Sequence, residues 1–376
     1  MDYLKKYLKY KTKYLTLTNY IDNKLDDQDG GKKQSSRRKK KKLYRNKHKN
    51  KELNVNIHNA KRLDDEGMVY MIDPSTIIYY CDRLRKYQFK CGKLGLILLT
   101  NLILITKRLI QKNNELLIGK NNDEINLIRK RGYDLYAEKP LLKKKLEKDE
   151  IPGTWTNDEY GDSGLQWMYI RHKSYQRFTE TWALLERCIN GGLLNFSNSN
   201  MRIVSLGGGP GFELLAFDLF MRNIHNNAIN TKLPNMEYVS LDFQQNWDIY
   251  VKELGYEFNQ WNVHNSDNSK IIGTNNKDII CILSNILSVC SNEKTADLFS
   301  NLLCNYKVNC ILMNERGKIQ SMVKLLEKRN IVVYHLLDQS FGTDDRQVVF
   351  FPPNTKLNYI LNDPPTFPNQ PFVRNK

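Results

Sequence analysis

The chain has 376 residues, of which 40% are hydrophobic, so it is long enough for two domains and apolar enough to bury a core. Its formal net charge is +17, and this charge is unevenly placed. Residues 1–62 hold twenty Lys or Arg and six Asp or Glu, a net +14, which leaves +3 for the rest of the chain. This distribution excludes a uniformly basic globular protein and predicts a basic tail joined to a nearly neutral body.

Cysteine usage and apolar runs argue against two further classes of protein. Seven cysteines are scattered through largely apolar stretches, at Cys81, Cys91, Cys188, Cys281, Cys290, Cys304 and Cys310. They form no CxxC pair and stand near no His pair at zinc-ligand spacing, so we expect buried free thiols, no metal site and an intracellular protein. The longest mainly apolar run, Leu94 to Ile105, has twelve residues, whereas a spanning helix needs about 20. We therefore expect no integral membrane segment.

The tail, residues 1–62, is predicted to be largely disordered after a short cationic amphipathic helix. The apolar face of this helix alternates spacings of four and three residues, at Tyr3, Tyr7, Tyr10, Tyr14 and Leu17. It packs on its own protein or docks on a partner or an anionic surface, and the sequence leaves both open. This opening resembles the N-terminal segments of many proteins encoded by giant DNA viruses, which share its richness in Lys, Asn, Ile and Tyr. The resemblance implies a viral protein of the host cytoplasm or nucleus, or one packaged in the virion.

The most basic part of the tail is a block of six consecutive residues. These are Arg37, Arg38, Lys39, Lys40, Lys41 and Lys42. Such a block cannot bury enough apolar surface to order itself. It can bind the phosphate backbone of a nucleic acid, act as a nuclear-import signal, or keep the chain soluble. Because a charge run reads no bases, a nucleic-acid partner is a hypothesis at this point.

Residues 63–152 are expected to form a helical region. Asp73 followed by Pro74 is typical of a helix start, and apolar residues follow at helical spacing. Two further helical segments are predicted over Leu94 to Ile110 and Asp123 to Lys148. Pro152 and Gly153 then mark a boundary, and an acidic loop over Asp158 to Asp162 follows.

Residues 153–353 alternate strands with helices after a helix predicted over Leu165 to Asn190. Seven short buried strands are predicted, over Ile203–Leu206, Tyr238–Leu241, Phe258–Val263, Ile279–Leu283, Cys310–Met313, Ile331–Leu336 and Gln347–Phe351. This order predicts an α/β fold with a doubly wound, mainly parallel seven-stranded sheet. Residues 354–376 are rich in Pro and Asn, and we expect a loose tail there.

A glycine-rich turn between the first of these strands and its helix is the strongest signal in the chain. Its glycines are Gly207, Gly208, Gly209 and Gly211. A ligand can lie against the backbone only where no Cβ intrudes, and glycine also allows the positive φ of a tight turn. A nicotinamide site would need a small residue where Phe212 stands. A ligand-free turn is the other alternative.

The GxGxG spacing of this loop resembles the first motif of class I, Rossmann-like S-adenosylmethionine-dependent methyltransferases, which cradles the amino-acid end of the cofactor. The resemblance covers residues 165–351. It implies that Asp242, at the end of the second strand, accepts the ribose hydroxyls. It also implies that Asn262 meets the adenine amino group, or His264 or Asn265 after a small shift in the alignment, and that Ser284 faces the cofactor.

One departure from that family concerns the position two residues before the first glycine. The family usually has Asp or Glu there, to receive the amino group of the cofactor, and this chain has Ser205. A hydroxyl is a weaker, uncharged acceptor, so either affinity is reduced or another carboxylate substitutes. Glu213, in the first turn of the following helix, is one candidate, although it also favours the helix N-terminus.

The reaction and the acceptor are less readable than the cofactor. No Asn-Pro-Pro-aromatic motif follows the fourth strand, which argues against methylation of adenine or glutamine amino groups, and no catalytic residue is identifiable. An RNA or other nucleic-acid acceptor would fit the basic tail. Two alternatives stay open: a catalytically inert scaffold of the same fold with a nucleic-acid-binding tail, and an aminopropyltransferase. Against the second, Pro210 stands where spermidine synthases have Asp.

Overall fold

The computed structural model describes residues 60–358 apart from short gaps. These gaps are residues 66, 74–75, 83–84, 91, 138–154, 195, 197–199, 228–234, 265–267, 274–276, 285, 291, 307, 317–318 and 338–344. The predicted N-terminal helix and the basic block at 37–42 lie outside the described residues, as does the boundary at Pro152 and Gly153. The predicted domain limits stay predictions.

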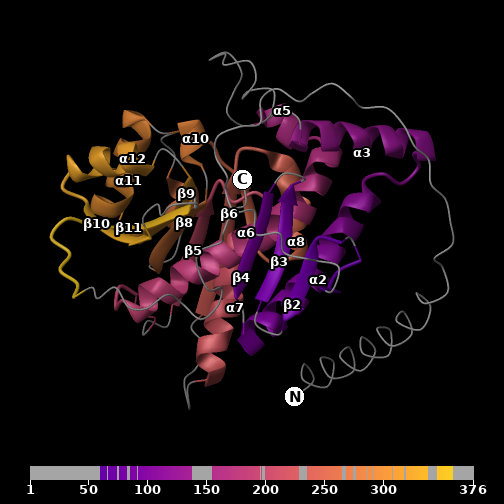
Figure 1. Ribbon diagram of the computed structural model, residues 1–376. Helices are drawn as coiled ribbons and strands as arrows, with labels where there is room; N and C mark the ends of the chain where they lie inside the picture. The colour runs from indigo at the N-terminus through magenta and orange to yellow at the C-terminus, as the bar shows by residue number, and fades with distance from the viewer. Residues whose placement is uncertain are drawn as a thin grey trace, which may run out of the picture. The chain divides into compact units, whose positions relative to one another are not determined.

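The described chain contains a large sheet of seven strands. Figure 1 labels most of these strands. The strands are β5 (Asn200–Leu206), β6 (Asn235–Asp242), β7 (Glu257–Gln260), β8 (Asp278–Ser284), β9 (Val308–Arg316), β10 (Val332–Leu337) and β11 (Asp345–Phe351). They lie in the order β10-β11-β9-β8-β5-β6-β7. β11 pairs antiparallel with both β10 and β9, and the other neighbouring pairs are parallel. All seven predicted strands are confirmed, although β7 ends three residues earlier than expected.

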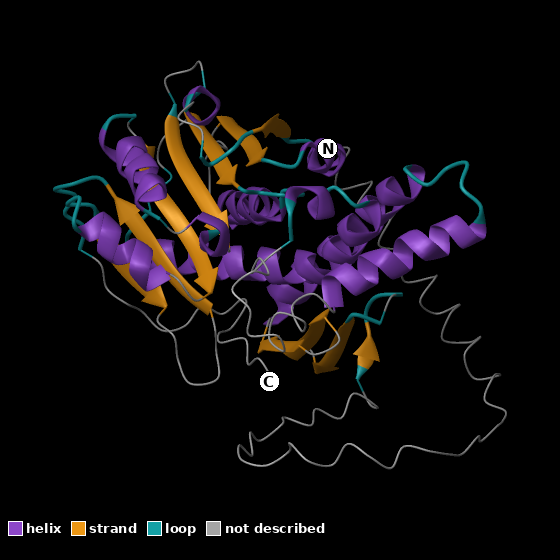
Figure 2. Ribbon diagram, turned by 90° about the horizontal axis from the view of Figure 1, so that it is seen from above, coloured by secondary structure: helices purple, strands orange, loops and turns teal. Residues whose placement is uncertain are grey.

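Helices cover both faces of this sheet, which confirms the doubly wound architecture (Figure 2). One face packs against α6 (Ser163–Asn190), α7 (Phe212–Asn227) and α8 (Asp248–Glu253). The other packs against α9 (Ser269–Ile272), α10 (Leu287–Cys290), α11 (Glu293–Cys304) and α12 (Ile319–Glu327). Successive strand residues alternate between the two cores, so Ile280 and Ile282 face α6 and α7 whereas Cys281 and Leu283 face α11 and α12.

The expected helix at Asp73 is wrong, because the chain forms a small antiparallel sheet there. Its strands are β1 (Lys61–Arg62), β2 (Val69–Asp73), β3 (Thr76–Asp82) and β4 (Arg85–Lys90). Asp73 pairs with Thr76, so β2 and β3 lie antiparallel to each other here and no helix begins at Asp73. The β-branched and aromatic run from Ile77 to Tyr80 favours a strand, and this propensity outweighs the helical spacing of its apolar residues.

The remaining helices agree with the sequence. The apolar run lies in α2 (Gly92–Glu115), and α3 (Asn122–Ala137) follows it. No helix of the described residues is long and apolar enough to cross a membrane. The acidic loop expected at 158–162 contains one helical turn, α5 (Asn157–Tyr160), whose N-terminus is capped by Thr156. Of the five described cysteines four are buried, and Cys304 is exposed, contrary to expectation.

Candidate functional site

The glycine loop lies at the carboxyl edge of the sheet, at the end of the central strand β5. From β5 the chain crosses to β6 on one side, whereas β8 lies on the other side, so the loop occupies the point where strand order reverses. Ligands of open α/β sheets bind at such a point. The backbone N–H groups of Gly207 and Gly208 donate to the carbonyl of Leu241, at 2.7 and 3.1 Å, which ties the loop to the end of β6.

Two positions of this loop require glycine for different structural reasons. A Cβ on Gly208 would lie 2.5 Å from Oγ of Ser240 and 2.6 Å from Oγ of Ser205, so the loop packs too closely on the strands for a side chain. Gly209 has φ of +49°, and the nearest atom to its Cβ position would be Cε2 of Trp247 at 3.9 Å. The backbone at Gly209 is therefore open to a ligand, and the loop below it is closely packed.

Asp242 ends β6 beside the loop, and both of its carboxylate oxygens accept backbone hydrogen bonds. Oδ2 accepts from the N–H of Gly209 and Oδ1 from the N–H of Gln244, each at 2.9 Å. Burial raises the pKa of this carboxyl to about 6, and these N–H groups oppose the rise because they favour the ionised form. A carboxylate oxygen has a second lone pair, so each can also accept a hydroxyl.

Aromatic side chains surround this corner of the site. Phe243, directly after Asp242, is 49% exposed and offers a flat apolar face at the sheet edge. The Trp247 ring is buried beside Gly209, and the ring of Tyr169 from α6 lies 5.4 Å from it, centroid to centroid. Sequence reasoning missed Phe243 and Trp247. Their closeness in sequence to Asp242 was the available signal.

The segment around α5 packs directly onto the residues that follow Asp242. Nε2 of Gln244 donates to the carbonyl of Asn157 at 2.6 Å, and Nδ2 of Asn246 donates to the carbonyl of Gly161 at 3.1 Å. A Cβ on Gly161 would meet Nε2 of Gln244 at 2.8 Å, so this contact is close. The predicted loop at 158–162 therefore adjoins the β6 side of the site.

Ser205 does not offer its hydroxyl to the space above the loop. Its side chain is buried beneath Gly208, next to Ser240 on the neighbouring strand. A residue in this place supports the loop from below. In the family, the acidic side chain at this position faces the cofactor, whereas the hydroxyl of Ser205 does not face the space above the loop.

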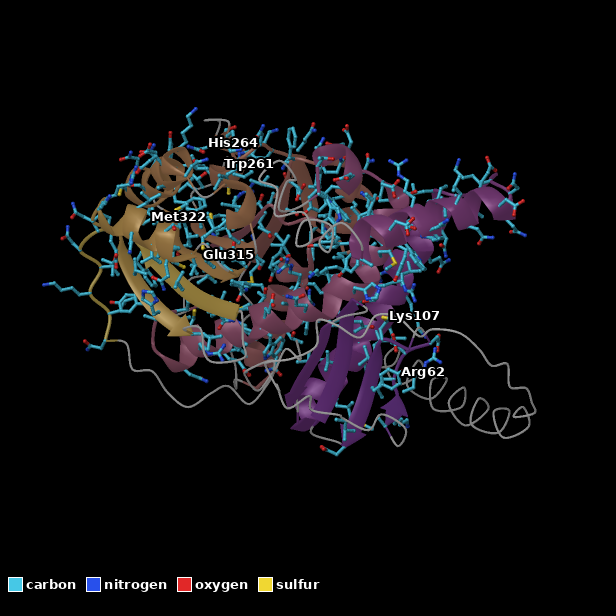
Figure 3. The ribbon with its side chains drawn as sticks, turned by 45° about the horizontal axis from the view of Figure 1, so that its top comes forward. Arg62, Lys107, Trp261, His264, Glu315 and Met322 are labelled. Atoms are coloured by element: carbon cyan, nitrogen blue, oxygen red, sulfur yellow. The ribbon has the colours of Figure 1, made fainter. Side chains whose placement is uncertain are left out.

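Asn262 lies two residues after β7, in a turn at the far edge of the sheet. Its Oδ1 accepts from the N–H of His264 at 2.9 Å, so the amide oxygen closes this turn. Trp261 and His264 appear together at this edge in Figure 3, and the N–H of Trp261 donates to the carbonyl of Asp242 at 2.8 Å. Asn262 thus lies, like Asp242, at the carboxyl ends of the strands, while its side-chain oxygen accepts a hydrogen bond within its own turn.

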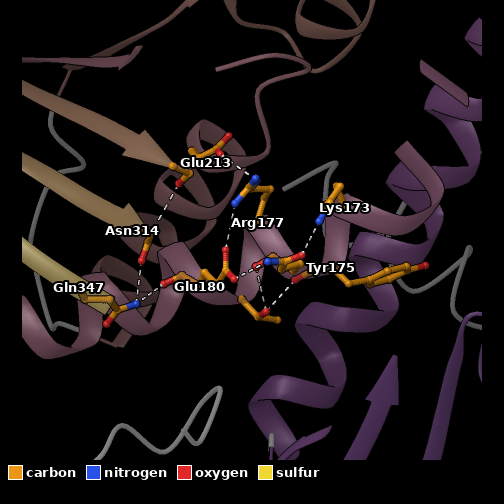
Figure 4. Close-up of polar contacts among 10 residues, drawn as sticks. Lys173, Tyr175, Arg177, Glu180, Glu213, Asn314 and Gln347 are labelled. Atoms are coloured by element: carbon orange, nitrogen blue, oxygen red, sulfur yellow. Dashed lines mark hydrogen bonds and ion pairs between the residues drawn. The ribbon is translucent and has the colours of Figure 1, made fainter. Parts of the chain in front are cut away.

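On the opposite, β8 side of the loop, charged side chains are buried in a network (Figure 4). Arg177 of α6 is 7% exposed and contacts two carboxylates. Its Nη1 lies 3.3 Å from Oε2 of Glu180, and its Nε lies 3.9 Å from Oε1 of Glu213 at the start of α7. Burial raises the pKa of the Glu213 carboxyl, whereas Arg177 and the Ser284 hydroxyl favour its ionised form.

This network continues through neutral side chains of the adjoining strands. Nδ2 of Asn314 lies 3.5 Å from Oγ of Ser284, and its Oδ1 accepts from Nε2 of Gln347 at 2.8 Å. The same Nε2 lies 3.0 Å from the carbonyl of Glu180 on α6. Ser284, a predicted site residue, therefore contacts Glu213 and Asn314 at the end of β8. No local motif identifies Arg177, Glu180, Asn314 or Gln347 as a set, because their contacts span up to 167 residues.

Neither a known family model nor a curated protein sequence matches the chain. Among solved structures, an O-methyltransferase family protein from Burkholderia thailandensis is 11% identical, with a TM-score of 0.40 over 63% of this chain and 75% of that one. The pyocyanin biosynthetic protein PhzM is 16% identical, with a TM-score of 0.36 over 56% and 66%. Human N-acetylserotonin methyltransferase, in complex with S-adenosylmethionine, is 13% identical, with a TM-score of 0.32 over 53% and 57%. Similarity of this size does not assign a function to the chain.

Proposed function

We propose that the chain binds S-adenosylmethionine at the glycine loop and is a methyltransferase. The observation that carries this proposal is the pairing of Gly209 with Asp242. An open backbone position lies next to a half-buried carboxylate that holds the loop and keeps lone pairs for two hydroxyls. A nucleoside ribose presents two adjacent hydroxyls, and the aromatic face of Phe243 lies next to that carboxylate.

The residues fit the parts of such a cofactor. Asp242 would receive the ribose hydroxyls, Phe243 would adjoin the base, and the backbone from Gly207 to Gly211 would border the sulfur and the amino-acid arm. The bound cofactor supplies an activated methyl group on a positively charged sulfur. The task of the chain is to align that group with an acceptor and to exclude water, which needs no acid or base in the sequence.

A catalytically inert scaffold of the same fold is the second candidate, and one observation favours it. Ser205 is buried beneath the loop, so it cannot supply the acidic contact that the family usually makes with the cofactor. Cofactor binding separates the two candidates, because a scaffold without a ligand has no need of an open backbone at Gly209.

Calorimetric titration of S-adenosylmethionine into the full chain tests the proposal. Gly209→Arg places a long side chain over the open backbone and is expected to abolish binding. Gly255→Arg is the matched control, because Gly255 also has a positive φ, +86°, with nothing within 4 Å of its Cβ position, and lies just before β7, away from the carboxyl edge. Binding that the first variant loses and the second keeps supports the site. No binding to the folded wild-type chain favours the inert scaffold.

For the acceptor we propose RNA or another nucleic acid. The support is the net +14 of residues 1–62, including the block from Arg37 to Lys42. Deleting residues 1–59, which leaves β1 in place, should weaken RNA binding and flatten its salt dependence, because phosphate contacts release counterions. Unchanged RNA affinity at low salt after the deletion contradicts this acceptor.

A further inference from the structure

The burial of Ser205 leaves the proposed cofactor without an acceptor for its amino group at the usual place. S-adenosylmethionine carries an α-ammonium group, and leaving such a charge unpaired in a desolvated pocket is costly. An acceptor near the glycine loop on the side away from Asp242 would complete the site. That side is the β8 side, because the ribose position at Asp242 lies at the end of β6.

Glu213 lies on that side. It is the second residue of α7, directly after the glycine loop, and only 4% of it is exposed. Ser284, at the carboxyl end of β8, hydrogen-bonds its carboxylate. Glu213 thus lies across the loop from Asp242, where the amino-acid arm of a bound cofactor would extend.

The contacts of Glu213 also leave it capacity for another donor. Arg177 lies closer to Glu180, at 3.3 Å, than to Glu213, at 3.9 Å, which is beyond hydrogen-bond distance. Gln176 donates to Glu180 as well, at 2.6 Å. One guanidinium therefore serves two buried carboxylates, and the one nearer the loop is the less completely paired. An added cation beside Glu213 would improve the balance of charge in this network.

We propose that Glu213 supplies the carboxylate that is missing at Ser205 and receives the α-amino group of S-adenosylmethionine. This inference rests on the proposed function of the glycine loop. Arg177 is a positioning residue in this arrangement: it contacts the carboxylates of Glu180 and Glu213, and its charge opposes the rise that burial causes in the pKa of Glu213. Burial raises the pKa of Tyr169, and Arg177, Glu213 and Asp242 also act on it, so this side chain lies near all three groups.

The test compares ligands that differ only in this arm. S-adenosylhomocysteine carries the amino group, its deaminated analogue keeps the carboxylate alone, and 5′-methylthioadenosine lacks the arm. The wild-type chain should bind S-adenosylhomocysteine about 10- to 100-fold more tightly than the deaminated analogue, the usual effect of a charge-assisted hydrogen bond. Glu213→Gln should lose that preference while binding 5′-methylthioadenosine as the wild type does. Glu213→Asp, which keeps the charge, should retain part of the preference.

Glu293→Gln is the matched control, because it makes the same chemical change at a carboxylate of α11 that pairs with Arg329, outside this network. It should keep the preference for the amino group. A wild-type chain that binds both arm-bearing ligands equally overturns the assignment without any variant. So does a Glu213→Gln chain that keeps the full preference or weakens all three ligands alike. If the wild-type chain binds none of the three ligands, 5′-methylthioadenosine included, that result contradicts the proposed cofactor site itself.

Discussion

The two sides of the glycine loop hold their acidic groups in different ways. On the β6 side, the Asp242 carboxylate accepts from backbone N–H groups of Gly209 and Gln244, residues that lie near it whatever the neighbouring side chains are. On the β8 side, Glu213 and Glu180 depend on side chains from α6 and the strands. Backbone geometry thus fixes the position of the carboxylate on the β6 side. On the β8 side, the carboxylates are positioned by side chains that hydrogen-bond or pair with one another.

The largest effect on stability is expected when the cation of the β8 network is removed. Arg177→Met should lower the free energy of unfolding by about 3–5 kcal/mol, because it leaves two buried carboxylates without their guanidinium. Urea denaturation followed by circular dichroism measures this. Arg329→Met removes an arginine that pairs with the exposed Glu293 and Asp297, and it should cost less than about 1 kcal/mol. Equal losses in both variants would contradict a special role for the buried network.

A smaller effect is expected from the neutral end of the same network. Gln347→Leu removes the donor to Asn314 and to the carbonyl of Glu180, so it should cost about 1–3 kcal/mol of stability. Gln260→Leu, on the exposed edge of β7, is the control and should change stability by less than about 0.5 kcal/mol. If Gln347→Leu is as harmless as its control, the strands do not depend on this network.

On the β6 side the expected signature is pH dependence. Because the pKa of Asp242 is raised to about 6, its carboxylate is protonated below that pH and then accepts ribose hydroxyls poorly. Affinity for 5′-methylthioadenosine should be constant above about pH 7 and fall about tenfold per pH unit well below 6. Titrations from about pH 5 to 8 measure this. Asp242→Asn should bind more weakly with a flat profile, and a flat wild-type profile would argue against a ribose contact.

The smallest expected effect concerns the exposed aromatic ring next to Asp242. Phe243→Ala should weaken 5′-methylthioadenosine binding by about fivefold, in line with the lower range for stacking of a base on an aromatic side chain. Stability should hardly change, because the ring is half exposed. Tyr306→Ala, an exposed aromatic between α11 and β9, is the control and should leave the affinity unchanged. Equal affinities in both variants would exclude a stacking role for Phe243.

The sequence predicted the features whose causes are local. The seven strands are short apolar runs that a parallel sheet buries on both faces, and the glycine loop needs its residues for its own backbone shape. Asp242 was also predictable, because it directly ends a strand. The helix expected at Asp73 was wrong because Asp-Pro opens both helices and hairpins, and the antiparallel pairing of the strand before Asp73 with the strand after it decides between them.

The β8 network could not be predicted for a different reason. Arg177, Glu180 and Gln347 become neighbours only when α6 packs against the completed sheet, and nothing in the residues around each one marks it. For Ser205, by contrast, the local sequence did point to a role. Its place before the first glycine indicated a cofactor contact, and only the packing of Gly208 over it revealed that its side chain lies beneath the loop.

The antiparallel strand β11 has a consequence for how the protein is made. It enters the sheet between β9 and β10, and it carries Gln347 into contact with α6. Because a ribosome delivers the chain from its N-terminus, the Asp242 side can assemble while residues 345–351 are still in the exit tunnel. The contacts of Gln347 with Asn314 and with the carbonyl of Glu180 can form only after this strand has emerged. The growing polypeptide can therefore reach a stage in which the glycine loop and Asp242 are in place while the network on the β8 side still lacks its last member.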